Sequence, residues 1–101
     1  MTDAALRLLG LGLRARTVVI GVSGVRAALQ RGTVLCAVVA ADASPRTADK
    51  VARLARGKSI PLLVGPTAER LGQALGRPPV QAVGVTDGAL ARGVVAAFGG
   101  V

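Results

Sequence analysis

The sequence has very little of the chemistry that enzymes use. Among 101 residues there is no histidine, tyrosine or tryptophan, only one glutamate, Glu69, and four aspartates. General acid–base catalysis, nucleophilic triads and metal centres are built from clusters of those residue types. We therefore expect no enzymatic activity, no bound metal, no cofactor and no small-molecule substrate.

Aromatic side chains are also nearly absent, and Phe98 is the only one. This excludes binding surfaces that stack bases on aromatic rings, as RRM and OB modules do. Any contact with RNA would have to use arginine, backbone amides and aliphatic surface. The core must likewise be filled by alanine, valine, leucine and isoleucine, which the 51% hydrophobic content allows.

Cysteine and long apolar runs are scarce as well. The single Cys36 excludes an intramolecular disulfide and lies in an apolar run, so we expect a buried thiol. The longest apolar runs are far shorter than the roughly 20 residues that span a bilayer. Asp3 and Arg7 make the first segment a poor signal peptide. We expect a cytoplasmic protein with no membrane partner.

Basic residues are the feature in excess. Thirteen lysines and arginines, eleven of them arginine, face five acidic residues and give a net charge of +8. Each guanidinium group can bind a phosphate through two hydrogen bonds, and a cluster of them releases counterions from a nucleic acid. The excess of arginine therefore favours a polyanionic partner. Charge alone leaves open an arginine-rich solvated surface that binds nothing.

Hydrophobic periodicity predicts helices that alternate with short strands. We expect helices over residues 4–11, 23–31, 45–57, 67–75 and 87–98, and strands over 17–20, 33–41, 60–64 and 80–86. Ser23, Ser44, Thr67 and Asp87 are the expected N-caps, while Gly32, Gly57 and Gly76 end helices. The pattern predicts one α/β domain over 1–101, a three-layer α/β/α sandwich with a four-stranded mixed sheet and about five helices.

Two segments are candidates for binding. In residues 18–26 a strand passes through a small-residue turn into a helix, whose free N–H groups suit a phosphate or nucleic-acid backbone. This turn does not fit a dinucleotide fingerprint, because Ser23 and Arg26 stand where glycine is required, and it lacks the Gly-Lys-Ser/Thr that a Walker loop has after four spacer residues. In residues 75–80 two prolines stiffen a loop that carries Arg77 and an aliphatic surface. Each segment could equally be an ordinary connection.

Several segments together carry a family resemblance. They are Leu9–Arg16, Gly21–Gly32, Ala41–Ser44, Thr47–Val51, Ile60–Pro61, Leu71–Gly76 and Val83–Asp87. In this order they resemble a bacterial YlxQ-type protein of the L7Ae/L30e ribosomal-protein superfamily, whose archaeal and eukaryotic members bind kink-turn RNA. The resemblance covers nearly the whole chain and consists of many weak motifs.

The resemblance implies an RNA-binding role with altered base reading. In the family the turn after the first strand typically reads Gly-x-Asn-Glu-x-x-Lys, and its polar side chains read sheared G·A pairs. Here Gly21 matches the glycine, but Ser23 replaces the asparagine, Gly24 the glutamate and Ala27 the lysine. The Gly-Glu-Glu of YlxQ-type proteins is missing too. The proline loop is similar in role to the family loop that cradles an extruded base.

The leading interpretation is thus a protein that binds structured RNA, such as a kink-turn or ribosomal RNA, alone or on the ribosome. Its binding should depend strongly on salt and have reduced kink-turn specificity, since phosphate attraction survives the loss of base contacts. The alternative is a protein-interaction or regulatory module that has lost RNA recognition. The predicted RNA-binding residues are Gly21, Val22, Ser23, Gly24, Arg26, Ala27, Arg31, Arg77, Pro78, Pro79, Val80, Arg14 and Arg16.

The distribution of the arginines should discriminate between these interpretations. Convergence of the basic residues on the Ser23 turn and the Pro78 loop favours RNA binding, whereas scattered charge beside an exposed apolar patch favours a protein partner. For the carboxylates, we expect Asp49 to pair with Arg53 and Asp42 to close a turn, rather than the two to share a metal.

Overall fold

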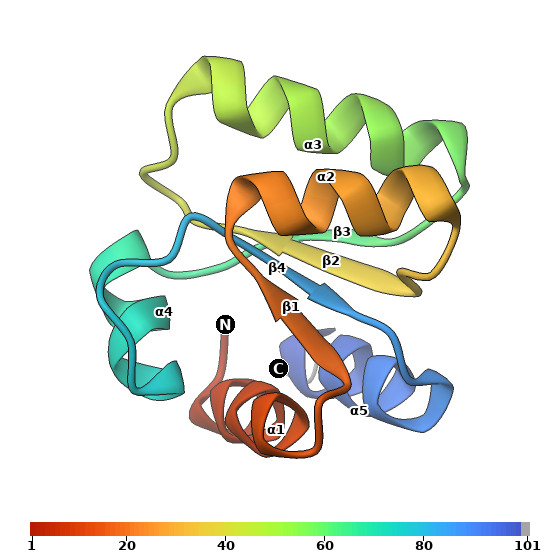
Figure 1. Cartoon of the computed structure of the whole chain (residues 1–101). Helices are drawn as coiled ribbons and strands as arrows, with labels where there is room; N and C mark the ends of the chain where they lie inside the picture. Colours follow the sequence, from red (N-terminus) through yellow and green to blue (C-terminus); the bar gives the residue numbers. More distant parts are fainter. Residues whose placement is uncertain (100–101) are drawn as a thin grey trace.

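A four-stranded mixed sheet lies between two layers of helices in the computed structural model, which describes residues 1–99 (Figure 1). The elements, in chain order, are α1 (Asp3–Arg14), β1 (Val18–Ile20), α2 (Val22–Arg31), β2 (Cys36–Val39), α3 (Pro45–Gly57), β3 (Leu62–Val64), α4 (Ala68–Leu75), β4 (Ala82–Val85) and α5 (Gly88–Gly99). The strand order is β1-β4-β2-β3. β4 is antiparallel to β1 and β2, whereas β2 and β3 are parallel.

The helices divide unequally between the two faces of the sheet. α2 and α3 pack together on one face, and α1 packs with α4 and α5 on the other (Figure 1). The predicted three-layer α/β/α architecture with five helices is therefore confirmed.

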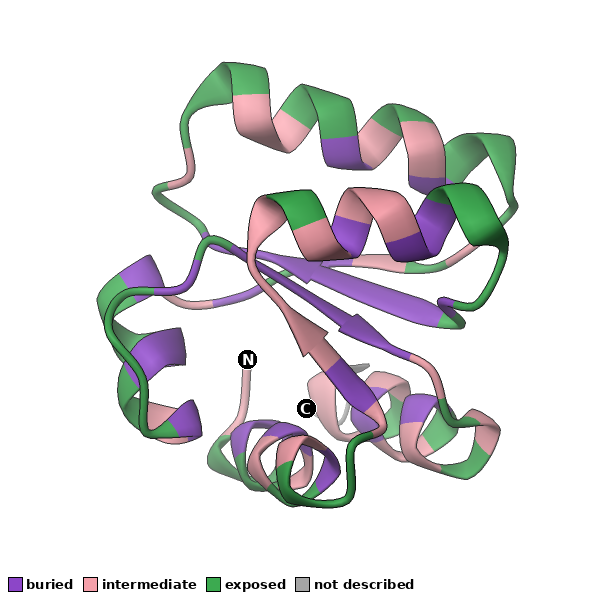
Figure 2. Ribbon diagram, viewed as in Figure 1, coloured by how far each residue is buried: buried purple, intermediate pink, exposed green. Residues whose placement is uncertain are grey.

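The two central strands are completely buried, as Figure 2 shows. Along β2, Cys36 and Val38 contribute to the core under α1, α4 and α5, and Ala37 to the core under α2 and α3. Successive residues of a strand point to opposite faces, so a continuous apolar run is what a doubly covered strand requires. The strand is shorter than the predicted 33–41, although the N–H groups of Leu35 and Ala40 extend its pairing with Val85 and Gln81 at 2.7 and 2.9 Å.

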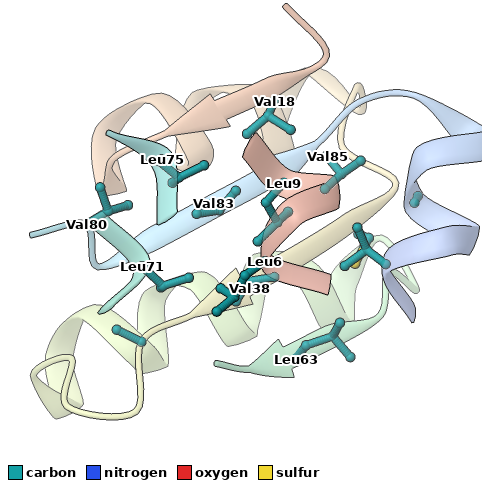
Figure 3. Packing of buried hydrophobic residues seen from close by; sticks show 14 of the residues in the cluster. Leu6, Leu9, Val18, Val38, Leu63, Leu71, Leu75, Val80, Val83 and Val85 are labelled. Carbon is teal, nitrogen blue, oxygen red and sulfur yellow. The ribbon is translucent and has the colours of Figure 1, made fainter. Parts of the chain in front are cut away.

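The larger core lies beneath α1, α4 and α5 (Figure 3). Leu6 and Leu9 of α1 pack there with Leu71 of α4 and with Val83 and Val85 of β4. Each is buried to within a few per cent, and a buried leucine contributes about 1.5–3 kcal/mol relative to exposure. The missing aromatic volume is replaced by many branched aliphatic contacts.

The first helix is longer than expected, because its glycines do not end it. α1 continues past Gly10 and Gly12 to Arg14. A Cβ on Gly12 would collide with the side chain of Leu90, and a Cβ on Gly10 would lie 3.2 Å from the carbonyl oxygen of Ala74. These glycines let α1 approach α5 and α4 closely, and this packing outweighs their helix propensity of roughly 1 kcal/mol below alanine.

Most of the expected helix ends are confirmed. The hydroxyl oxygens of Ser44 and Thr67 accept hydrogen bonds from the N–H groups of Thr47 and Arg70, each at 3.2 Å. The carboxylate of Asp87 accepts from the N–H of Leu90 at 2.9 Å. Gly32 and Gly76 end α2 and α4 in the left-handed conformation that glycine tolerates.

The two aspartates considered as a metal pair have separate structural roles. Asp49 forms the expected ion pair with Arg53 at 3.0 Å, one helical turn away. The carboxylate of Asp42 accepts a hydrogen bond from the N–H of Ala68 at 2.8 Å, at the first turn of α4. Within residues 1–99 no three metal-binding side chains gather, and no helix is both long and apolar enough to cross a membrane.

Candidate nucleic-acid interface

The sheet brings the two candidate binding segments together although 48 residues, 27–74, lie between them in the sequence. β1 and β4 are antiparallel neighbours, with Ile20 opposite Val83. The end of β1 therefore lies beside the start of β4, and the N–H of Gly21 donates to the carbonyl oxygen of Ala82 at 2.9 Å. The turn that leaves β1 and the loop that enters β4 thus form one edge of the molecule.

A groove of about 410 Å³ lies between these two segments. Residues 20–22 line one side, and residues 77–81 line the other. Its lining side chains are aliphatic apart from those of Arg77 and Gln81, and backbone polar groups are exposed between them. We call it the β1–β4 groove. A surface with one cation and rigid aliphatic walls suits a nucleotide, whose base has an apolar face and whose phosphate is anionic.

The helix that starts at this groove has no side-chain cap. Its N-cap is Gly21, with φ of +92°, rather than the predicted Ser23. The glycine takes up the turn between β1 and α2, which leaves Ser23 exposed as the second residue of the helix. The first N–H groups of a helix, here those of Val22, Ser23 and Gly24, have no partner within it. They present a positive edge at the groove.

The opposite wall is a loop fixed against α4. The N–H of Arg77 donates to the carbonyl oxygen of Gly72 at 2.8 Å, and that of Val80 to the carbonyl oxygen of Ala68 at 2.9 Å. A Cβ on Gly72 would lie 2.7 Å from the carbonyl oxygen of Arg77 and closer still to that of Pro78. Sequence reasoning missed this role of Gly72, because the contact forms only when the chain after Gly76 turns back against α4.

The side chains of this loop have different environments. Pro78 and Pro79 are exposed, as is Arg77, whereas Val80 is buried and packs into the larger core. The prolines therefore form the outer wall, and Val80 anchors the loop. Ile20 and Gln81 also line the groove, although the sequence did not single them out. Ile20 ends β1 and Gln81 immediately precedes β4. Predicting that these two strands pair would have placed both residues at the groove.

The predicted arginines do not all converge on the groove. Only Arg77 lines it. Arg26 lies four residues after Val22 and three before Leu29, both of which pack in the core beneath α2 and α3. It is half-buried, and its Nε is buried without a hydrogen-bond partner among residues 1–99.

Three further arginines lie away from the groove. Arg31 ends α2, about 15 Å along the helix from Gly21. Arg14 ends α1 and lines a hollow between α1 and α4. Arg16 precedes β1 and so lies at its far end from Gly21. The predicted arginines therefore do not converge on the Ser23 turn, because helix and strand lengths carry these three away, and this scatter is the outcome that favours a protein partner. Ala27 is half-buried on α2.

An exposed apolar surface is also present. Leu35 is 45% exposed at the start of β2 and lines a second hollow of about 490 Å³ beside α5. Pro61, Ala91 and Val95 contribute to the same hollow, with Arg92 as its one charged residue. This patch is the feature that the alternative interpretation predicted.

Comparisons with known proteins agree with this architecture. The sequence profile of the Ribosomal protein L7Ae/L30e/S12e/Gadd45 family matches residues 3–94. A solved structure of a protein with unknown function from Bacillus halodurans C is 31% identical, with a TM-score of 0.91, and the match covers 96% of this chain and 98% of that one. A Giardia lamblia 15.5kD RNA binding protein has the same fold, with 22% identity, a TM-score of 0.81 and coverage of 95% and 82%. No curated protein matches the sequence.

Proposed function

Because the chain belongs to the Ribosomal protein L7Ae/L30e/S12e/Gadd45 family, we propose that it is a non-enzymatic RNA-binding protein whose β1–β4 groove holds a nucleotide of a structured RNA. The observation that best supports this proposal is the groove between the Gly21 turn and the Arg77–Val80 loop. The structural neighbour described as an RNA binding protein supports the same class of ligand.

The chemistry of the groove suits a base that has left its helix. The aliphatic walls of Ile20, Val22 and Pro79 would cover the face of the base, and Arg77 would bind a phosphate. The free N–H groups at the start of α2 would donate to the sugar–phosphate backbone or to a base edge. Rigid walls bind with little ordering entropy, so the groove can act without aromatic stacking.

Selectivity for kink-turn RNA should be reduced. A bidentate side-chain contact to a base discriminates by about 1–3 kcal/mol. Ser23 has a short hydroxyl, and Gly24 and Ala27 have no polar side chain at all. Affinity should therefore come mainly from phosphate contacts, which depend on salt but not on sequence. Candidate RNAs are a kink-turn and ribosomal RNA.

Titrating a kink-turn RNA and a matched plain duplex at two salt concentrations tests this proposal. We expect measurable binding to both, a small preference for the kink-turn, and a steep loss of affinity at the higher salt. Arg77→Gln should weaken binding to both and lower the salt slope by about one, whereas Arg92→Gln, on the opposite side of the fold from α2 and α3, should not. No affinity for either RNA would refute the proposal.

A second candidate function rests on the exposed Leu35 hollow. The alternative is a protein-interaction module in which an apolar side chain of a partner enters this hollow, lined by Pro61, Ala91 and Val95. Leu35→Asp would then abolish co-purification of the partner and leave RNA titrations unchanged. Loss of RNA binding in Leu35→Asp, with the fold intact, would contradict that assignment.

A further inference from the structure

Charge is divided between the two helical layers of this protein. Seven of its thirteen cations lie on α2, on α3 or at their ends: Arg26, Arg31, Arg46, Lys50, Arg53, Arg56 and Lys58. Asp49 is the only carboxylate on these two helices. Asp3, Glu69 and Asp87 lie at the starts of α1, α4 and α5, and Asp42 binds the start of α4. The α2–α3 layer therefore carries six of the eight units of net charge.

The cations in the first turn and middle of α3 work against the stability of that helix, whereas Arg56 in the last turn lies at the favourable, negative end of its dipole. Its first turn contains no acid, and Arg46 lies there beside the positive end of the helix dipole. Lys50 and Arg53, like Arg53 and Arg56, are three residues apart, so like charges are neighbours on the exposed surface. The only compensating pair, Arg53 with Asp49, has side chains 77% and 52% exposed and contributes little. A polyanion bound to this face would relieve that repulsion.

We propose that the exposed face of α3, centred on Lys50, Arg53 and Arg56, binds the phosphate backbone of the duplex that continues from the nucleotide in the β1–β4 groove. This inference rests on the proposed function. α3 lies beside α2 in one layer (Figure 1), and Val22, the first residue of α2, lines the groove. Lys50 and Arg56 are about 9 Å apart along the helix axis, enough to reach more than one phosphate.

The surface of α3 favours a nucleic acid over a protein partner. Protein interfaces have an apolar centre, with aromatic and aliphatic anchors. The large exposed hydrophobic residues among residues 1–99 are Leu11, Leu35 and Val64, and none of them lies on α3. Phosphate contacts need only cations, which position a duplex without reading its sequence.

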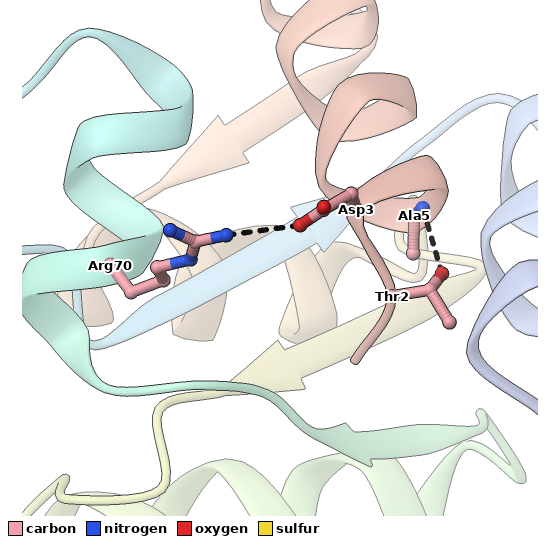
Figure 4. Close-up of polar contacts among 4 residues, drawn as sticks. All are labelled: Thr2, Asp3, Ala5 and Arg70. Atoms are coloured by element: carbon pink, nitrogen blue, oxygen red, sulfur yellow. Dashed lines mark hydrogen bonds and ion pairs between the residues drawn. The ribbon is translucent and has the colours of Figure 1, made fainter.

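The test compares two triple variants that remove the same charge. Lys50→Gln, Arg53→Gln and Arg56→Gln together remove three cations from α3 and break the exposed Asp49–Arg53 pair. The control removes Arg7, Arg70 and Arg92 from the other layer in the same way, and breaks the exposed Asp3–Arg70 pair, also at 3.0 Å (Figure 4). The cap of α1, in which the Thr2 hydroxyl oxygen accepts from the N–H of Ala5, stays intact in the control.

Each variant is titrated with a kink-turn RNA that has long duplex arms and with one whose arms are trimmed. For the long-armed RNA we expect the α3 variant to bind about tenfold more weakly at low salt, with a salt slope shallower by about 2–3 than that of wild type. The trimmed RNA should bind wild type and the α3 variant alike. The control should match wild type on both RNAs.

The outcomes separate this inference from the proposed function. If wild type and the α3 variant bind both RNAs equally, the α3 face is not an RNA surface, although the groove still binds RNA. If wild type binds neither RNA, the proposed function fails first. If the control loses as much affinity as the α3 variant, net charge explains the binding and the inference is wrong. Melting curves check folding, and we expect the α3 variant to melt no lower than wild type.

Discussion

Replacing Gly72 with alanine should displace the loop that forms one wall of the β1–β4 groove, because Gly72 lies on α4 against the backbone of that loop. The new Cβ would lie 2.7 Å from the carbonyl oxygen of Arg77, 2.8 Å from the carbonyl carbon of Pro78, and closer still to the Pro78 carbonyl oxygen. All three atoms are backbone, so no side-chain rotation removes the collision. The loop must move away from α4 by several tenths of an ångström.

Opposing effects determine the size of the change in stability. Alanine gains about 1 kcal/mol of helix propensity over glycine within α4. Overpacking costs about 1–3 kcal/mol, and the hydrogen bond from the Arg77 N–H to the Gly72 carbonyl, now 2.8 Å, is worth about 1 kcal/mol. We expect a net loss of about 1–3 kcal/mol. For a domain of this size that lowers the melting temperature by roughly 4–24 °C.

Thermal unfolding followed by circular dichroism measures this change, and RNA titration well below the melting temperature measures its effect on the groove. Gly57→Ala is the matched control, because it also lies in a helix and a Cβ there would meet nothing within 4 Å. Gly57→Ala should be neutral or slightly stabilising and should bind RNA normally. The reasoning is refuted if Gly72→Ala is as stable as wild type and binds RNA with unchanged affinity.

Three further outcomes can be measured. Ser23→Asn combined with Gly24→Glu should increase the preference for kink-turn over duplex RNA; an unchanged ratio in competition titrations would mean that this turn does not face RNA. Gly21→Ala should lose about 1–3 kcal/mol in denaturant unfolding, since Gly21 has φ of +92° and ψ of 149°, a backbone conformation that essentially only glycine adopts. Burial raises the pKa of the Cys36 thiol from 9.0 to about 11, so unfolded chains ionise first and stability should fall as the pH rises from 9 towards 11. Cys36→Ala should remove that fall.

The parts of the fold that depend on local chemistry were predictable from sequence. Ser44 followed by Pro45 starts α3, and Thr67 and Gly76 cap the two ends of α4, as expected. Caps and left-handed glycines act within a few residues, so their signal is complete in the sequence. The continuous apolar run around β2 likewise indicated a doubly covered strand.

The errors arose where a distant segment decides the outcome. Gly12 lies within a helix because it packs against Leu90, 78 residues later in the sequence. Ser23 is not the cap because strand pairing of β1 with β4 ends at Gly21, and the helix begins there. The dispersal of the cations follows from the lengths of α1, β1 and α2, which move Arg31 to the opposite end of α2 from the groove.

Affinity and selectivity for RNA should reside on different parts of this molecule. The β1–β4 groove has one cation, Arg77, so it attracts phosphates only weakly. It can distinguish one RNA from another by its shape and by the free N–H groups at the start of α2. The α3 face has several cations and no exposed large apolar group, so it can attract phosphates but not distinguish bases. For a kink-turn and a plain duplex of equal length, changes at the uncharged groove positions Val22 or Ser23 should therefore alter the ratio of the two affinities and leave the salt slope fixed. Changes on Lys50 or Arg56 should alter the salt slope and leave that ratio fixed. A Val22, Ser23, Lys50 or Arg56 variant that changed both quantities together would mean that the two surfaces contact the same part of the RNA.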